Sequence, residues 1–181
     1  MGIKNKRDRR WMLLFVVAAL VLGASRWRVS GQSAGLIPVA RREATPDLTL
    51  RQLGGGEWKL ADHRGRVVLM NFWATWCEPC RDEMPALAQV LRQTGPQGVA
   101  MVGVSMDTGP NTQALVQQFA TQYRLPWAIA FPDTMLRLRS DGIGIPTTVL
   151  LDKQGRRAKT YVGEVDRATL AADVAALLGE D

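Results

Sequence analysis

The chain contains two cysteines, and both stand at one junction between predicted elements. Cys77 and Cys80 follow directly on the apolar run at residues 67–73. A run of this kind is typical of a strand buried on both faces of a sheet. A helix is expected from about residue 79 to residue 93, with Pro85 kinking it. The cysteine pair is therefore expected where a buried strand gives way to a helix.

The spacing of the pair favours redox chemistry. A disulfide across so short a loop removes little entropy from the unfolded chain, which makes a structural role a weak explanation. Structural zinc would need two more Cys or His ligands, and the one histidine, His63, stands upstream in an expected exposed turn. At a helix N-terminus Cys77 is favoured as a thiolate and attacking nucleophile, and Cys80 can resolve the mixed disulfide. Glu78 and Pro79 between them set the geometry and the relative stability of the reduced pair.

Alternating strands and helices with short connections follow from about Pro46 onward. This order predicts an α/β sandwich around a mixed sheet. Residues 47–53 and 57–60, joined by three glycines, are expected to form an opening hairpin. Further strands are expected at 100–106, 127–131, 147–152 and 157–162. Further helices are expected at 111–123, as one or two turns within 133–139, and from a cap at Asp166 to residue 178.

The net charge of +6 is confined to the N-terminus. Residues 1–30 hold seven of the 23 Lys and Arg and one of the 17 acids, so the remaining residues carry 16 basic and 16 acidic groups. Because the rest of the chain has no net charge, it offers no excess of positive charge to bind a phosphate backbone, which argues against nucleic-acid binding.

The N-terminus has the layout of a membrane-targeting segment. Residues 1–10 form a basic tail expected in the cytoplasm, and 15 uncharged, mostly apolar residues follow at 11–25. As a helix this run reaches about 22 Å, short of a hydrocarbon core of about 30 Å, which favours a cleaved signal peptide. Bracketing tryptophans, flanking arginines and a poor cleavage site favour an uncleaved signal anchor instead. A buried core helix fits less well, because the run is apolar on every face.

The segment after the apolar run shows no periodicity. Residues 26–45 are expected to be a linker, and residues 46–181 the folded domain.

Two motifs together resemble a known family. The run NFWATWCEPCRDEMP at residues 71–85 and the run GIPTT at residues 144–148 are similar to those of the TlpA and ResA type of membrane-anchored, thioredoxin-like oxidoreductase, which includes the CcmG and DsbE proteins of cytochrome c biogenesis. The resemblance covers residues 46–181. It implies a thioredoxin-like fold, with a mixed sheet flanked by helices, a hairpin extension and an N-terminal membrane helix.

The resemblance also implies a role for the second motif. The Ile145-Pro146 bond is expected to be cis and to pack against Cys77, where the Ile145 backbone can pair with an incoming cysteine-containing peptide as an added strand. The alternative is that Pro146 merely opens a strand.

The resemblance further places Glu83 in the active-site cavity. There it can tune the thiol pKa values and relay the proton when Cys80 attacks; the alternative is a solvated surface carboxylate. Trp76 is expected to shield Cys77 and to offer an apolar contact to substrate, although Trp73 and Trp76 could both serve packing alone.

The function implied is reduction of protein disulfides outside the cytoplasm, on the periplasmic face of the membrane. The family's reductant comes from a membrane thiol donor of the DsbD or CcdA type, and its clients are the haem-site cysteines of apocytochromes c or copper-site cysteines. A monomer with no cofactor besides the redox-active Cys77–Cys80 disulfide is expected. A peroxidase would require a Thr three residues before its cysteine, whereas Thr75 is two before Cys77. A copper chaperone would want a third ligand where Ile145 stands.

Overall fold

A computed structural model describes residues 35–133, 136 and 144–180 of the chain. In this part seven strands form one sheet in the order β2-β1-β5-β4-β3-β6-β7. Strand β4 is parallel to both of its neighbours, β3 and β5, and every other neighbouring pair is antiparallel. The predicted mixed sheet and opening hairpin are thus confirmed. The strands are β1 (Thr49–Gln52), β2 (Glu57–Lys59), β3 (Val67–Trp73), β4 (Val99–Ser105), β5 (Ala128–Phe131), β6 (Thr147–Leu151) and β7 (Arg157–Val162).

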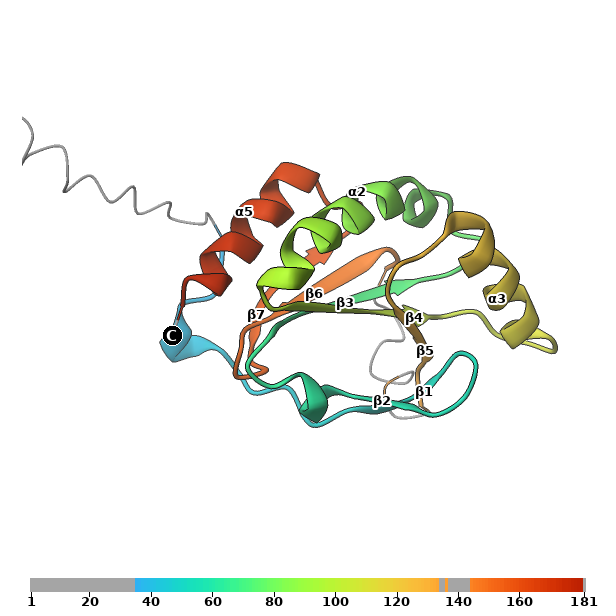
Figure 1. Ribbon diagram of the computed structural model, residues 1–181, viewed down its shortest axis with the longest axis horizontal. Helices are drawn as coiled ribbons and strands as arrows, with labels where there is room; N and C mark the ends of the chain where they lie inside the picture. Colours follow the sequence, from blue (N-terminus) through green and yellow to red (C-terminus); the bar gives the residue numbers. More distant parts are fainter. Residues whose placement is uncertain (1–34, 134–135, 137–143, 181) are drawn as a thin grey trace, which may run out of the picture. The chain divides into compact units, whose positions relative to one another are not determined.

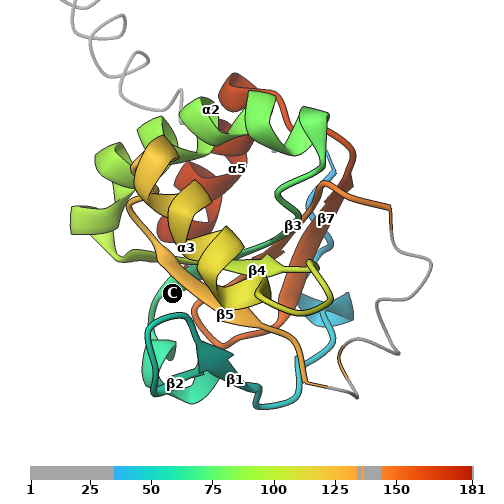
Figure 2. The ribbon, with the colours of Figure 1, turned by 90° about the vertical axis from the view of Figure 1, so that its right-hand side faces the viewer.

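Three α-helices cover one face of the sheet (Figures 1 and 2). They are α2 (Glu78–Thr94), α3 (Thr112–Tyr123) and α5 (Arg167–Leu178), and short 3₁₀ turns occur at η1 (Val39–Arg41), η2 (Leu60–His63) and η3 (Gly95–Gln97). The predicted cap of α5 is confirmed, because Asp166 Oδ1 accepts the Thr169 N–H at 2.8 Å. Pro85 lies inside α2, as predicted. The helical turns expected within 133–139 fall largely outside the described residues.

The predicted membrane segment at residues 11–25, with the basic tail before it, lies outside the described residues. Across residues 35–133, 136 and 144–180, no helix has both the length and the apolarity to cross a bilayer.

Strand β3 divides the core into two halves. Successive side chains of a strand point to opposite faces. Val67, Leu69 and Trp73 accordingly pack in the cluster beneath the helices, together with Cys77 and Cys80. The alternate positions Val68, Met70 and Phe72 join a second cluster on the other face. The remaining odd position, Asn71, therefore shares the helix-facing side of the strand.

The predicted linker is wrong in its described part. Arg42 is buried and donates to Asp152 Oδ2 at 3.1 Å and to Glu180 Oε1 at 2.8 Å, while Ala44 forms a bridge with Arg156. The two ion pairs of Arg42 and the backbone bridge of Ala44 hold this segment against the C-terminal part of the fold. Because none of them depends on periodicity, the sequence pattern could not show that the folded part begins before Pro46.

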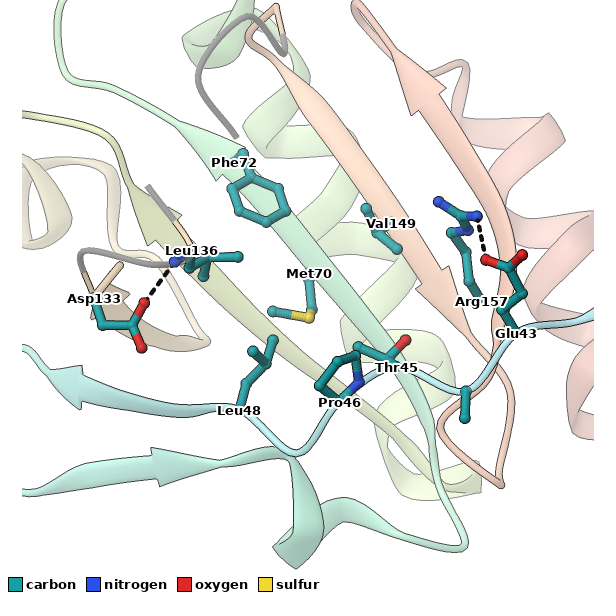
Figure 3. A pocket seen from close by; sticks show the side chains of 11 residues that line it. Glu43, Thr45, Pro46, Leu48, Met70, Phe72, Asp133, Leu136, Val149 and Arg157 are labelled. Carbon is teal, nitrogen blue, oxygen red and sulfur yellow. Dashed lines mark hydrogen bonds and ion pairs between the residues drawn. The ribbon is translucent and has the colours of Figure 1, made fainter. Parts of the chain in front are cut away.

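A cavity of about 390 Å³ lies on the sheet face opposite α2 (Figure 3). Met70 and Phe72 line it, and Arg157 pairs with Glu43 at 3.1 Å beside it. Since these β3 side chains point away from the helices, the sheet separates the cavity from the cysteine pair.

Gly103 in β4 leaves room for two indole rings. A Cβ at this position would lie 2.8 Å from both Trp73 Nε1 and Trp127 Nε1. We expect Gly103→Ala to lower the free energy of unfolding by about 1–3 kcal/mol, because both indoles are buried and neither can move freely. Urea unfolding of the oxidised protein measures the loss. As a control, Gly95→Ala places its Cβ 3.8 Å from Leu91 Cδ1, and we expect a change within about 0.5 kcal/mol. Equal stability of the two variants would contradict this account of Gly103.

Candidate active site

The cysteine pair lies at the N-terminus of α2, directly after the turn that follows β3. Cys77 is the N-cap residue, and its Sγ is joined to Cys80 Sγ in a disulfide. The Cys80 backbone N–H also donates to Cys77 Sγ at 3.3 Å. Pro79 fits in the first turn because the N–H it lacks would have no partner within the helix. The local sequence thus places the first sulfur at the positive end of the helix dipole.

The two cysteines differ in their exposure to solvent. Cys77 keeps 5% of its surface exposed, whereas Cys80 is fully buried. Only the first can meet a partner without rearrangement. In the reduced state, the helix N-terminus and the Cys80 N–H favour a thiolate at Cys77.

Glu83 lies one turn further along α2, on the same buried side as Cys80. Its side chain is 1% exposed, so the alternative of a solvated surface carboxylate does not hold. Burial raises the pKa of the Glu83 carboxyl to about 7; hydrogen bonds from Asn71 and the Val165 N–H oppose the rise, and the charge of Glu164 adds to it. The carboxyl can therefore take up or release a proton near neutral pH.

Two further polar residues beside Glu83 were not predicted. Asn71 Nδ2 donates to Glu83 Oε1 at 2.7 Å and to Thr148 Oγ1 at 3.0 Å, and both hydrogen bonds are buried. Asn71 and Thr148 are direct neighbours across β3 and β6. One signal was available: an amide within an otherwise apolar strand must find a buried partner.

A third unpredicted residue, Asp107, supports the loop before the cysteines. The buried Asp107 accepts the Thr75 N–H at 3.0 Å, the Thr75 hydroxyl at 2.6 Å and the Ser105 hydroxyl at 2.9 Å. The carboxylate at the end of β4 thereby fixes the residue two positions before Cys77.

The second motif precedes β6. The Ile145-Pro146 peptide bond is cis, as the family resemblance implied. Ile145 is partly buried against the core cluster that contains Cys77 and Cys80. The Pro146 carbonyl accepts the Gly163 N–H at 2.8 Å, which ties the motif to the end of β7. The fold thus brings residues 144–148 to the core cluster that holds the cysteine pair.

The remaining predicted residues take different positions around the pair. Trp76 is 69% exposed, and Glu78 and Pro79 are exposed as well. Trp73 is fully buried in the core, where its ring packs 5.0 Å from that of Phe119. His63 differs from the expectation, because it is only partly exposed and stacks on Trp58 at 4.9 Å.

The described residues offer no ready metal site. Within residues 35–133, 136 and 144–180, no three or more His, Cys, Asp or Glu side chains gather in an arrangement that could hold an ion.

Known proteins with similar sequences agree with the site described above. The sequence pattern of the AhpC/TSA family matches residues 42–173. The thiol-disulfide oxidoreductase ResA of Geobacillus thermodenitrificans is 31% identical over 164 residues, which cover 90% of this chain and 92% of that protein.

Solved structures agree with the sequence match. The putative thiol:disulfide interchange protein DsbE of Chlorobium tepidum superposes with a TM-score of 0.68 at 30% identity, covering 76% of this chain and 97% of that chain. A secreted thiol-disulfide isomerase of Corynebacterium glutamicum superposes with a TM-score of 0.71 at 27% identity, covering 83% of this chain and 95% of that chain. The thioredoxin-like fold is thus common to proteins named for thiol-disulfide chemistry.

Proposed function

The chain belongs to the AhpC/TSA family and is a thiol-disulfide oxidoreductase, and on this premise we propose that it reduces disulfides of cysteine-containing proteins outside the cytoplasm. One observation carries the proposal. A cysteine that keeps 5% of its surface exposed at a helix N-terminus is bonded to a fully buried cysteine, one turn from a buried carboxyl whose pKa is raised to about 7. This arrangement separates an attacking thiol, a resolving thiol and a proton acceptor.

The reaction consists of two exchanges. The Cys77 thiolate attacks a client disulfide, so that a mixed disulfide forms and one client sulfur leaves as a thiolate. Cys80 then gives its proton to the Glu83 carboxylate and attacks Cys77 Sγ. The Cys77–Cys80 disulfide forms, the second client sulfur leaves, and two electrons have passed to the client. Reduction by an external dithiol restores the starting state.

The surface around Cys77 suits a peptide substrate. Among the hydrogen bonds between described residues, none uses the Ile145 backbone, so its N–H and C=O can pair with an extended client segment. Pro146 fixes the approach of that segment. The exposed ring of Trp76 adds apolar contact area beside the nucleophile. Glu78 and Pro79 face solvent between the sulfurs, where they set the stability of the reduced pair.

The proposed setting is the periplasmic face of a cell membrane. Residues 11–25 would serve as a signal anchor, or as a cleaved signal that leaves the domain free outside the cell membrane. An oxidising compartment requires that a reductase be supplied with electrons, and a membrane thiol donor of the DsbD or CcdA type fits that need. The secreted location named for the Corynebacterium glutamicum relative supports this setting. The protein would act as a monomer, with its disulfide as the only redox group.

Trapping the client tests the proposal. We expect Cys80→Ala, expressed as the full chain, to accumulate mixed disulfides through Cys77, because the resolving thiol is gone. Nonreducing electrophoresis followed by mass spectrometry identifies the trapped proteins, and apocytochromes c or copper-site proteins are the expected clients. The matched control is Cys77→Ala with Cys80 intact, which should trap nothing, since Cys80 is buried.

Two outcomes would count against the proposal. Trapping of only non-cytochrome, non-copper partners would overturn the named clients while leaving the chemistry in place. A tight one-to-one copper complex of the reduced protein, with no disulfide reduction, would favour a copper chaperone over a reductase.

A further inference from the structure

Asn71 is the side chain that joins the sheet to the buried carboxyl of α2. It is fully buried on the helix-facing side of β3, among apolar residues. Its amide nitrogen makes both hydrogen bonds described above, to Glu83 and to Thr148. Its amide oxygen accepts no hydrogen bond from the described residues. A buried amide whose nitrogen donates two hydrogen bonds while its oxygen accepts none is uncommon and calls for an explanation.

The proton relay places conflicting demands on the partner of Glu83. An ionised carboxylate needs donors around it, whereas a protonated carboxylic acid needs an acceptor for its own O–H. The Val165 N–H, 3.3 Å from Oε2, can only donate. Because the side chain is 1% exposed, solvent cannot readily supply the missing acceptor. The relay therefore needs a buried partner that can both donate and accept.

An asparagine amide meets both demands if it can turn over. With Glu83 ionised, Nδ2 donates to Glu83 Oε1, as observed. With Glu83 protonated, a half-turn of the amide brings Oδ1 to the same place, where it accepts the acid's O–H. The Thr148 hydroxyl is equally adaptable, since it accepts from Nδ2 in the first state and donates to Oδ1 in the second. A carbonyl oxygen with two lone pairs can accept from both neighbours at once.

We propose that Asn71, held by Thr148, is the positioning residue of the Glu83 proton relay, whose amide turns over as Glu83 changes its protonation state. This inference rests on the proposed reductase function, because it assigns how the carboxyl of that site can change charge inside a closed core. Asn71 acts through Glu83, and its side-chain hydrogen bonds go to Glu83 and Thr148 rather than to either sulfur.

The other groups around Glu83 cannot take this part. From the connection between β7 and α5 come the Val165 N–H and the negative charge of the exposed Glu164. From α2 itself comes Cys80, which is the proton donor in the relay. Among the described residues, no Lys or Arg forms a hydrogen bond or ion pair with Glu83. The amide and the hydroxyl are thus the adjustable neighbours.

Direct titration of Glu83 tests the proposal without relying on activity. The carboxyl carbon of Glu83 is followed by ¹³C NMR against pH in the oxidised full chain, where neither cysteine titrates. We expect Asn71→Leu, of similar volume, to raise the midpoint by about one pH unit, because the charge-assisted hydrogen bond that the ionised form loses is stronger than the neutral one that the protonated form loses. We expect Asn71→Asp to raise it as well, since two adjacent carboxyls share one proton and the second is lost only at higher pH.

A matched pair at the neighbouring position isolates the hydroxyl. Thr148→Val removes the group that holds the amide, and we expect a smaller rise of the Glu83 midpoint. Thr148→Ser keeps the hydroxyl and should restore the wild-type midpoint. Should Asn71→Leu fail to fold, the aspartate variant and the Thr148 pair still decide the question. An unchanged midpoint in the variants that fold would overturn the proposal, and so would equal midpoints for Thr148→Val and Thr148→Ser.

The pH dependence of the resolving step connects the titration to chemistry. A mixed disulfide on Cys77 is prepared first, and its release by Cys80 is followed at several pH values. The pH profile of this release rate should shift in the same direction as the Glu83 midpoint of each variant. If the protein reduces no disulfide at all, the proposed function fails while the NMR midpoints still report on Asn71. If reduction is intact and the midpoints do not move, the positioning role fails by itself.

Discussion

Cys77→Ser is expected to reduce disulfide reduction by the full chain to the background rate of the assay. A hydroxyl in place of the thiol does not ionise near neutral pH, so the helix N-terminus has no thiolate to stabilise. The remaining thiol, Cys80, is fully buried and cannot substitute for it. Turbidimetric insulin reduction with excess dithiothreitol measures the loss.

The control for this loss is Cys80→Ala. It keeps Cys77, the less buried of the two cysteines, and we expect one equivalent of an aromatic disulfide to react with Cys77 and to remain attached, without turnover. Turnover by Cys77→Ser would show that attack begins elsewhere. Rapid release of the adduct by Cys80→Ala would show that Cys80 is not the resolving thiol.

The parts of the site that are contiguous in sequence could be predicted. Cys77 caps α2, and Cys80 and Glu83 lie on that helix, so spacing alone places the three relative to one another. The cis bond before Pro146 came instead from the family resemblance and could not be worked out from spacing. Its confirmation shows that residues 144–148 carry a recognisable motif.

The parts that depend on pairing between distant segments could not be predicted. Thr148 meets Asn71 only because β6 lies antiparallel beside β3, and register of that kind is set by the whole sheet. Asp107 meets Thr75 because β3 and β4 run parallel and end at the same edge. Arg42 finds Asp152 across most of the chain. Asn71 stands out as an amide in an apolar strand, but in each of these cases nothing in the sequence identifies the partner.

Glu83→Gln is expected to change how the stability of the oxidised protein depends on pH. The ordinary pKa of 4.5 applies to the unfolded chain, and the folded pKa is about 7. Between these values the folded state holds the proton more firmly than the unfolded state. The stability that protonation provides is therefore complete below about pH 4.5 and is lost as the pH rises through 7. For a separation of this size the loss amounts to up to about 3 kcal/mol.

The glutamine variant cannot ionise and should not suffer this loss. We expect the free energy of unfolding of Glu83→Gln, relative to wild type, to increase by up to about 3 kcal/mol between pH 5 and pH 8, which means that the variant becomes relatively more stable. Urea unfolding at several pH values measures the trend, which does not depend on any constant cost of the substitution itself. The control is Glu78→Gln, which removes an exposed carboxylate of the same helix and should leave the difference flat.

The same variant should be slow in the chemistry while remaining folded. Without a carboxylate to take the Cys80 proton, we expect the resolving step at neutral pH to slow by about 10²-fold. Stopped-flow release of a Cys77 mixed disulfide measures the rate. A stability difference that stays flat with pH would mean that Glu83 is ionised in the folded protein throughout this range. If Glu83→Gln shows both a slow, pH-independent resolving step and the predicted stability trend, the relay is assigned to Glu83. One ionisation, that of the Glu83 carboxyl, then accounts for both measurements.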